Sequence, residues 1–439
     1  MKNVFLNNRF FFALFGVGIC YVLAFFFPIL MGVAHGFLIV VFLAIFVDYL
    51  LLFKEKNAVQ AQRILPEKLS NGDQNSIKVD LKNNYPFQIK TVTIDEIPFQ
   101  FQKRDFFIER SIEAKKNVLF EYVLEPKERG EYSFGNLNIF AQTSLGFVSR
   151  RFTFQKDELV PSFPSFIHLR KYELMALQNE YLLGGIKKIR KTGHTMEFEQ
   201  IKDYIPGDDV RTINWKATSK RNQLMVNQFQ DEKSQRIFML IDKGRTMQMP
   251  FNGLSLLDYS INATMALSHI ILKKNDRAGM MTFSKKAENK VAADNKSGQL
   301  KKISQALYNI QTNFFESDFS RLYQEVKLHI GQRSLIVLFT NFETLDAVNR
   351  QMKYLRGIAK NHLLVVIFFK NAELQSLNTN PENIQAVYDE IIAEKLEYEK
   401  KLIIQQLRKY GIYTVYTLPE NLNLEVINKY LEIKARGIL

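Results

Sequence analysis

Arg236-Ile-Phe-Met-Leu-Ile-Asp242 is a run of apolar residues that ends in an acid. Comparable apolar runs follow at residues 334–340, 363–369 and 412–418, and the segments between them have helical patterns. Continuous apolar strands that alternate with helices predict a parallel sheet covered on both faces. We therefore expect a doubly wound α/β domain over residues 236–439, with any ligand site at the carboxyl ends of its strands.

The upstream residues 58–160 have a different pattern. Short β-branched or aromatic runs such as Thr91-Val-Thr-Ile94 are separated by turn residues such as Gly135-Asn136. This spacing predicts an antiparallel β-sandwich of immunoglobulin-like type, although no cysteine pair or tryptophan marks a true immunoglobulin domain. Such sandwiches present loops and edges to partners, and nothing in this segment is typical of a catalytic site.

The first 57 residues predict a membrane anchor of two helices. Two apolar runs, 10–27 and 36–53, are each long enough to cross a hydrocarbon core of about 30 Å with slight thinning. Basic residues precede the first run and follow the second, which predicts that both ends and all soluble domains lie in the cytoplasm, on an inner-membrane protein. The alternative is a cleaved signal peptide that ends near Ala34, which would leave the second run unexplained.

Asp48 is the only acidic residue within these two runs. We expect it to lie near the cytoplasmic interface and to be solvated. The alternative is a functional acid within the membrane.

Composition narrows the class of protein. The chain has 439 residues and a net charge of +14, which suits an anionic membrane surface, an acidic partner or nucleic acid. The single cysteine, Cys20, can form neither an intrachain disulfide nor a zinc site built from several cysteines, so a reducing compartment is expected.

Enzyme signatures are absent from the sequence. It contains no Gly-x-Ser-x-Gly, no Gly-x-x-x-x-Gly-Lys-Ser/Thr, no Gly-x-Gly-x-x-Gly and no His-Glu-x-x-His. The six histidines are widely spaced, and His194 is the one that lies inside the most distinctive segment. We therefore expect no catalytic residues, with an uncharacterised enzyme that uses Asp208 or Asp209 as the remaining alternative.

The most distinctive segment, residues 161–235, joins the two predicted domains. Its motifs are Gly193-His-Thr-Met-Glu-Phe-Glu199, Tyr204-Ile-Pro-Gly-Asp-Asp-Val-Arg211, Ile213-Asn-Trp215 and Leu224-Met-Val226, followed by the strand that ends at Asp242. Together they resemble the signature of the bacterial "domain of unknown function" family number fifty-eight. Members of that family are similar to this chain end to end, with two membrane helices, a β domain, the signature and a von Willebrand factor A-like domain.

Two interpretations of the signature follow from its residue types. Asp208, Asp209 and Arg211 are close enough around a Pro-Gly turn to fix the loop by charge-assisted bonds, with Trp215 packed beneath them. The functional interpretation is a docking epitope, because an aromatic residue and arginines dominate binding hot spots.

Basic residues surround the signature. The run at residues 187–191, with Lys216, Lys220 and Arg221, could contact nucleic acid or anionic lipid. No aromatic interleaving or nucleic-acid-binding fold accompanies these residues, so we expect no nucleic-acid partner.

The resemblance also implies a place to look for a metal. von Willebrand factor A-like domains often carry an adhesion site of pattern Asp-x-Ser-x-Ser, completed by a Thr and an Asp from later loops. Asp242 and Thr246 match the first element, Ser317 is matched to the later Thr, and Asn341 stands where the later Asp is expected. Gly244 replaces one hydroxyl and Asn341 removes one charge, so the site is degenerate and we expect no cofactor, with Mg²⁺ as the ion it would take.

These expectations combine into one functional hypothesis. The resemblance implies a membrane-anchored, non-enzymatic binding or scaffold protein that recruits a partner, a MoxR-type AAA+ ATPase, through its A-like domain and signature. The alternative is a chaperone-like factor for the assembly or secretion of envelope proteins.

Overall fold

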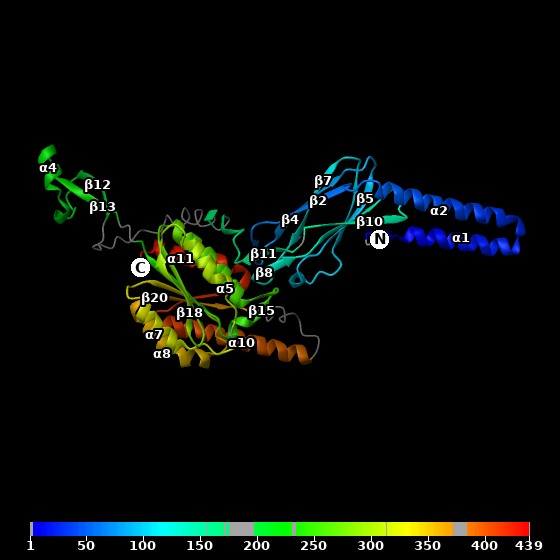
Figure 1. Cartoon of the computed structure of the whole chain (residues 1–439). Coiled ribbons are helices and arrows are strands. Elements are labelled where there is room, and N and C mark those ends of the chain that lie inside the picture. Colours follow the sequence, from blue (N-terminus) through cyan, green and yellow to red (C-terminus); the bar gives the residue numbers. More distant parts are fainter. Residues whose placement is uncertain are drawn as a thin grey trace. The chain divides into compact units, whose positions relative to one another are not determined.

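The computed structural model describes residues 3–155, 157–170, 173–174, 197–230, 234–312, 314–371 and 384–438. The chain divides into two compact units, residues 1–163 and 164–439 (Figure 1). Several residues named above, the basic run 187–191 and His194 among them, lie outside the described residues. The structure has the expected multidomain composition of apolar helices, a β-rich region and an α/β domain.

Two apolar helices begin the first unit. They are α1 (Asn8–Phe26) and α2 (Met31–Phe53), joined by the short 3₁₀ helix η1 (Pro28–Leu30). Both are long and apolar enough to cross a membrane, with mean hydropathy 2.0 for the first and 2.7 for the second. Their few buried residues include Val17 and Ala24 on α1 and Ala34 and Val41 on α2, at the heptad spacing typical of a helix-helix seam.

The β region consists of short strands around one core. The strands are β1 (Val4–Leu6), β2 (Val59–Ile64), β3 (Leu69–Ser70), β4 (Asn75–Asn83), β5 (Ile89–Asp95), β6 (Phe107–Ile112), β7 (Asn117–Leu124), β8 (Gly130–Phe134), β9 (Leu137–Gln142), β10 (Val148–Phe154) and β11 (Glu158–Phe163). They form three sheets of order β1-β10-β9-β5-β6, β3-β11-β8 and β2-β4-β7. Burial alternates along β4 and β5, so each strand turns one face to the shared core.

The first sheet contains a strand that the sequence pattern did not predict. β1 precedes the apolar helices in the chain and pairs antiparallel with β10, which comes last in the chain among the strands of that sheet. Three residues are too few for a periodicity signal, so only the tertiary contact with β10 identifies them as a strand.

Asp48 is neither solvated nor exposed. Its side chain is fully buried, and its carboxylate accepts hydrogen bonds from the Thr143 hydroxyl, from the Phe147 N–H at 2.8 Å and from the Val148 N–H at 2.9 Å. The same β9–β10 loop binds the start of α1, since Arg9 donates to the Leu145 carbonyl at 3.0 Å. The prediction of a solvated Asp48 is therefore wrong, because donors of this loop take the place of water.

The second unit contains a six-stranded sheet of order β18-β17-β14-β19-β20-β21. The strands are β14 (Arg236–Asp242), β17 (Arg277–Phe283), β18 (Ala287–Asp294), β19 (Leu335–Phe339), β20 (Leu363–Phe369) and β21 (Tyr413–Thr417). All neighbouring strands are parallel except β17 and β18, which form an antiparallel pair. Every residue of β19 and β20 is buried, as expected for a parallel sheet covered on both faces.

Helices cover both faces of this sheet (Figure 1). They are α5 (Leu256–Lys273), α6 (Gln299–Tyr308), α7 (Phe319–His329), α8 (Leu345–Asn361), α10 (Ile384–Lys409) and α11 (Leu422–Ala435). α5, α6 and α11 pack into one apolar cluster, and α7, α8 and α10 pack into the other. The predicted α/β layering is therefore confirmed, and the carboxyl end of central β14 places Asp242 at the edge where ligands bind in such sheets.

Candidate functional site

The signature folds into a small ordered unit, which we call the signature module (residues 197–230). It contains β12 (Glu197–Asp203), the 3₁₀ helix η3 (Val210–Thr212), α4 (Trp215–Arg221) and β13 (Met225–Gln230), and its two strands pair antiparallel (Figure 1). The Asn214 side chain accepts from the Ala217 N–H at 3.0 Å and so caps α4. The Thr218 hydroxyl accepts from the Met225 N–H at 3.0 Å, which ties α4 to β13.

Two acids of the module, Asp208 and Asp209, hold its turn. Asp208 accepts from the Lys202 ammonium at 3.0 Å and from the Ile205 N–H at 3.1 Å. Asp209 accepts from the Arg211 N–H at 3.0 Å and caps η3. The chain turns at Gly207, just before these two acids, and its φ of +109° is strained for any residue with a Cβ. Both carboxylates therefore have structural partners within the module, as expected for acids that fix the loop.

Trp215 and Arg211 do not complete a rigid unit with these acids. The Trp215 side chain is 71% exposed, so the prediction that it packs beneath the loop is wrong. The small core of the module is instead filled by Met225 and Val226, which are 3% and 1% exposed. A two-stranded sheet with one short helix encloses too little volume to bury an indole as well. Arg211 is also exposed, and its contact with Asp209 is made by its backbone N–H.

The module presents further apolar side chains to solvent. Ile205, Val210 and Leu224 are 60%, 64% and 46% exposed, which is unusual for aliphatic residues in so small a unit. Sequence reasoning missed them, because isolated aliphatic residues in a loop carry no periodicity signal. The exposed basic residues of the module are Arg211, Lys216, Lys220 and Arg221. The arrangement can bind a surface that offers apolar area together with negative charge.

The strand-end site around Asp242 has the opposite character. Asp242 is 2% exposed, and its Oδ1 accepts from the Gly244 N–H at 2.8 Å and from the Ser317 hydroxyl. Its Oδ2 accepts from the Thr340 hydroxyl at 2.7 Å. Burial raises the pKa of the Asp242 carboxyl, and the three hydrogen bonds oppose that rise. The structure thus brings Ser317 to Asp242 as expected, and it adds Thr340, a strand-end hydroxyl that the sequence analysis did not consider.

The other two residues of the expected metal site meet each other and not Asp242. The Asn341 amide donates to the Thr246 carbonyl at 3.5 Å, and Asn341 Oδ1 is buried without a hydrogen-bond partner among the described residues. Asp318, next to Ser317, caps α7 by accepting from the Arg321 N–H at 3.0 Å. A Cβ at Gly244 would overlap the Ser317 hydroxyl oxygen, so the Ser317 side chain fills the space that a hydroxyl residue at position 244 would need.

The donor set around Asp242 fits Mg²⁺ poorly. Mg²⁺ requires near-octahedral oxygen ligands and is usually held by one or two carboxylates, but both oxygens of Asp242 already accept hydrogen bonds. No group of three or more His, Cys, Asp or Glu side chains that could hold a metal ion occurs in the part of the chain that the structure describes. Asn341 Oδ1 is a buried hydrogen-bond acceptor without a partner among the described residues, so it is the atom at this site to which a ligand would donate.

Comparison with known families places the signature module at the start of a matched region. The family model described as "Protein of unknown function DUF58" matches residues 200–380, which run from β12 past the end of β20. The uncharacterised protein YeaD of Bacillus subtilis (strain 168) is 22% identical over 262 residues, which cover 58% of this chain. The match spans 63% of the length of that relative.

Solved structures that resemble parts of the chain include two that overlap nearly half of it. The SpRpn10 VWA domain has a TM-score of 0.29 and 12% identity, and covers 44% of this chain and 94% of its own. The conserved hypothetical protein BatB from Bacteroides thetaiotaomicron has a TM-score of 0.28 and 11% identity, and covers 45% of this chain and 98% of its own. The CARDB domain of the PF1109 protein from Pyrococcus furiosus has a TM-score of 0.18 and 13% identity, and covers 25% of this chain and 94% of its own.

Proposed function

We propose that this protein is a membrane-anchored binding or scaffold protein that recruits a protein partner through its signature module. The observation that carries the proposal is the 71% exposure of Trp215 on a helix whose start is capped and whose body is tied to β13. An indole held out on an ordered scaffold loses little conformational entropy on binding and contributes large contact area. The exposed arginines and lysines of the module favour a partner surface with negative charge.

The partner is a MoxR-type AAA+ ATPase. This part of the proposal rests on the family that the signature motifs resemble. The α/β domain, as a von Willebrand factor A-like domain, would add a second contact. The proposed role is non-enzymatic. The structural partners that Asp208 and Asp209 already have within the turn support this part of the proposal.

Capture of the ATPase by the detergent-solubilised protein tests the docking role. We expect Trp215→Ala to weaken capture about thirtyfold or more, as for a central aromatic hot spot, and Arg211→Ala to weaken it less. Phe99→Ala removes an aromatic side chain that is 86% exposed in the β region of the first unit, and Arg104→Ala removes an exposed arginine of the same region. Both controls should capture the ATPase like the unchanged protein. Unchanged capture by both module variants in folded protein would refute the docking role.

The location of the protein is a separate part of the proposal. The two apolar helices would form a hairpin in the inner membrane, with the β region and the second unit in the cytoplasm, which is supported by the basic residues on either side of the hairpin. A reporter that is active only in the cytoplasm should work when fused after Leu439, and a periplasmic reporter at the same place should be silent. The reverse result would remove the proposed access to a cytosolic ATPase.

A further inference from the structure

The edge strand β21 exposes backbone groups that no described residue binds. β21 pairs with β20 alone among the described strands, and the Thr417 carbonyl accepts from the Lys370 N–H that follows β20. Backbone groups of successive residues in a strand point to opposite sides, so the N–H and C=O groups of Thr414 and Tyr416 point away from β20. Within the described residues, no backbone hydrogen bond satisfies these four groups.

The two edges of the sheet differ in how they are protected. The opposite edge strand, β18, contains Glu288 and Lys290, has irregular register with β17, and has a positive φ of 45° at Asn289. Charges and bulges of this kind prevent another strand from pairing with an edge. β21 has the sequence Tyr413-Thr-Val-Tyr-Thr417, which consists of strong strand formers without a charge or a proline. It therefore lacks the features that block strand addition.

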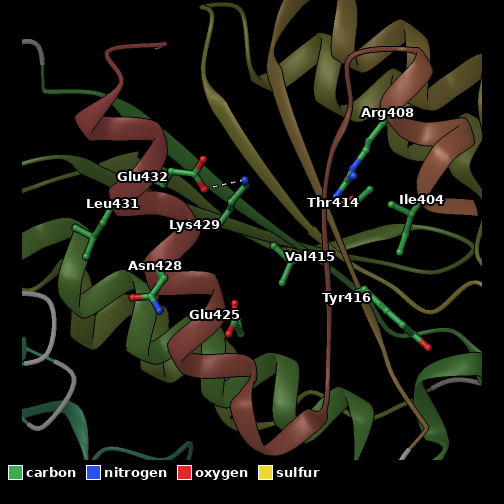
Figure 2. A pocket seen from close by; sticks show the side chains of 10 residues that line it. All are labelled: Ile404, Arg408, Thr414, Val415, Tyr416, Glu425, Asn428, Lys429, Leu431 and Glu432. Carbon is green, nitrogen blue, oxygen red and sulfur yellow. Dashed lines mark hydrogen bonds and ion pairs between the residues drawn. The ribbon is translucent and has the colours of Figure 1, made fainter. Parts of the chain in front are cut away.

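A groove lies along this open edge. Its volume is about 650 Å³. Figure 2 shows Thr414, Val415 and Tyr416 of β21 flanked by side chains of α10 and α11. These helices belong to opposite faces of the sheet, because α10 packs in one apolar cluster and α11 in the other. A second copy of the domain would carry its own flanking helices into the same space, so the groove suits a single extended segment and not another sheet edge.

The charges at the rim differ between the two ends of the groove. Arg408, near the end of α10, lies beside Thr414 at the start of the strand (Figure 2). α11 runs back from the far end of β21, so Glu425 in its first turn lies toward the end of the strand. Lys429, one turn later, lies over the Tyr413 ring at 5.2 Å, and its ammonium pairs with Glu432 at 2.9 Å, so Arg408 supplies the uncompensated positive charge near the start. A segment with an acid at one end and a base at the other complements this distribution.

We propose that this groove binds an extended peptide segment of a partner protein by strand addition to β21, with an acidic side chain at the Arg408 end and a basic side chain at the Glu425 end. The main-chain groups of Thr414 and Tyr416 supply the pairing, and the half-buried Ile404 of the lining contacts the side chains that the segment turns toward α10. The site is separate from the signature module, and its occupation does not depend on Trp215.

Binding of three synthetic peptides to the detergent-solubilised full chain tests the groove. The probe is acetyl-Glu-Val-Thr-Val-Thr-Lys-amide, and the controls carry Glu at both ends or Lys at both ends. The mixed-end peptide places both charges correctly when it pairs parallel to β21, so we expect it to bind about fivefold more tightly than either control. It should also slow amide hydrogen exchange in residues 412–418. Failure of all three peptides to bind, or equal binding by the controls, would overturn the proposal.

Two variants locate the bound peptide. Thr414→Pro removes an N–H that points into the groove and keeps the hydrogen bonds to β20, so the mixed-end peptide should bind about tenfold more weakly or worse. Thr414→Val keeps that N–H and should bind normally. Arg408→Ala leaves β21 unchanged, so it tests the site even if the proline variant fails to fold, and it should remove the advantage over the Lys-ended peptide. Trp215→Ala should bind all three peptides as the unchanged protein does. Binding that survives both Thr414→Pro in folded protein and Arg408→Ala would place the peptide elsewhere.

Discussion

The signature module and the strand-end site use similar residue types in opposite ways. In the strand-end site, Asp242 is 2% exposed and accepts three hydrogen bonds from within the fold. In the module, Asp208 and Asp209 also accept hydrogen bonds from nearby residues, but Trp215 is 71% exposed and Arg211 is exposed as well. An acid at a strand end can therefore stabilise the fold, and a tryptophan in a small unit can remain exposed to solvent.

We therefore expect the strand-end site to contribute to stability and the signature module to contribute to partner binding. Substitutions at the strand-end site should change the free energy of unfolding, because they leave buried donors unpaired. Substitutions of the exposed side chains of the module should change binding and leave stability nearly unchanged.

Asp242→Ala should give the largest effect on stability. Removing the carboxylate leaves the Ser317 and Thr340 hydroxyls and the Gly244 N–H without their acceptor, so we expect a loss of about 3 kcal/mol in the free energy of unfolding. Denaturant unfolding of the detergent-solubilised protein measures it. Thr246→Ala is the matched control and should cost less than about 0.5 kcal/mol. A loss below about 1 kcal/mol for Asp242→Ala would show that the hydrogen bonds of Asp242 contribute little to stability, as the exposed side chains of the module are expected to do.

Lys400 should make the stability of the α/β domain depend on pH. Its ammonium donates to the Phe342 carbonyl, one residue beyond Asn341, and burial lowers its pKa from 10.5 to about 8. The folded state therefore releases this proton at lower pH than the unfolded state, and stability should rise as pH increases from about 8 toward 10.5. Lys400→Met should remove this rise when unfolding is measured across that pH range. An identical pH profile for the variant would show that Lys400 is not the group responsible.

Trp215→Ala should leave stability almost unchanged. An exposed side chain contributes little burial, so we expect the free energy of unfolding to change by less than about 0.5 kcal/mol. Thermal and denaturant unfolding of the variant measure this beside the large change in capture. A loss of about 3 kcal/mol would mean that the indole is buried in the working protein, and that the module is a structural unit only.

Mg²⁺ should produce the smallest effect of all. A ligand that bound only the folded state would stabilise it by about 2.7 kcal/mol at a hundredfold excess over Kd. Because both oxygens of Asp242 already accept hydrogen bonds, and Gly244 and Asn341 supply neither the hydroxyl nor the charge of an intact site, we expect millimolar Mg²⁺ or Mn²⁺ to leave the melting temperature at the value of a monovalent-salt control. A metal-specific increase of several degrees that disappears in Asp242→Ala would show that the strand-end site binds an ion.

The sequence predicts the elements whose burial pattern is periodic. The apolar runs at 236–242, 334–340 and 363–369 identify strands covered on both faces, and the apolar runs before residue 53 identify two long helices. It also indicates that Ser317 belongs with Asp242, through the resemblance and not through periodicity.

The rest depends on contacts between distant residues. The burial of Asp48 requires donors of the β9–β10 loop, about a hundred residues away in the chain. The exposure of Trp215 depends on how little volume its module encloses, which a residue list cannot show. The Thr340 hydroxyl lies at a strand end, and its position beside Asp242 follows only from the neighbouring places of β14 and β19 in the sheet.

The fluorescence of Trp215 reports on the docking role of the signature module, because it is the only tryptophan in the chain. We predict the red-shifted emission of an exposed indole in the purified protein, with quenching by acrylamide close to that of free tryptophan. Addition of a MoxR-type ATPase whose tryptophans are replaced by phenylalanine should shift the emission to the blue and reduce quenching. Blue-shifted, quench-resistant emission before any partner is added, or an unchanged signal when the ATPase is bound, would contradict the account.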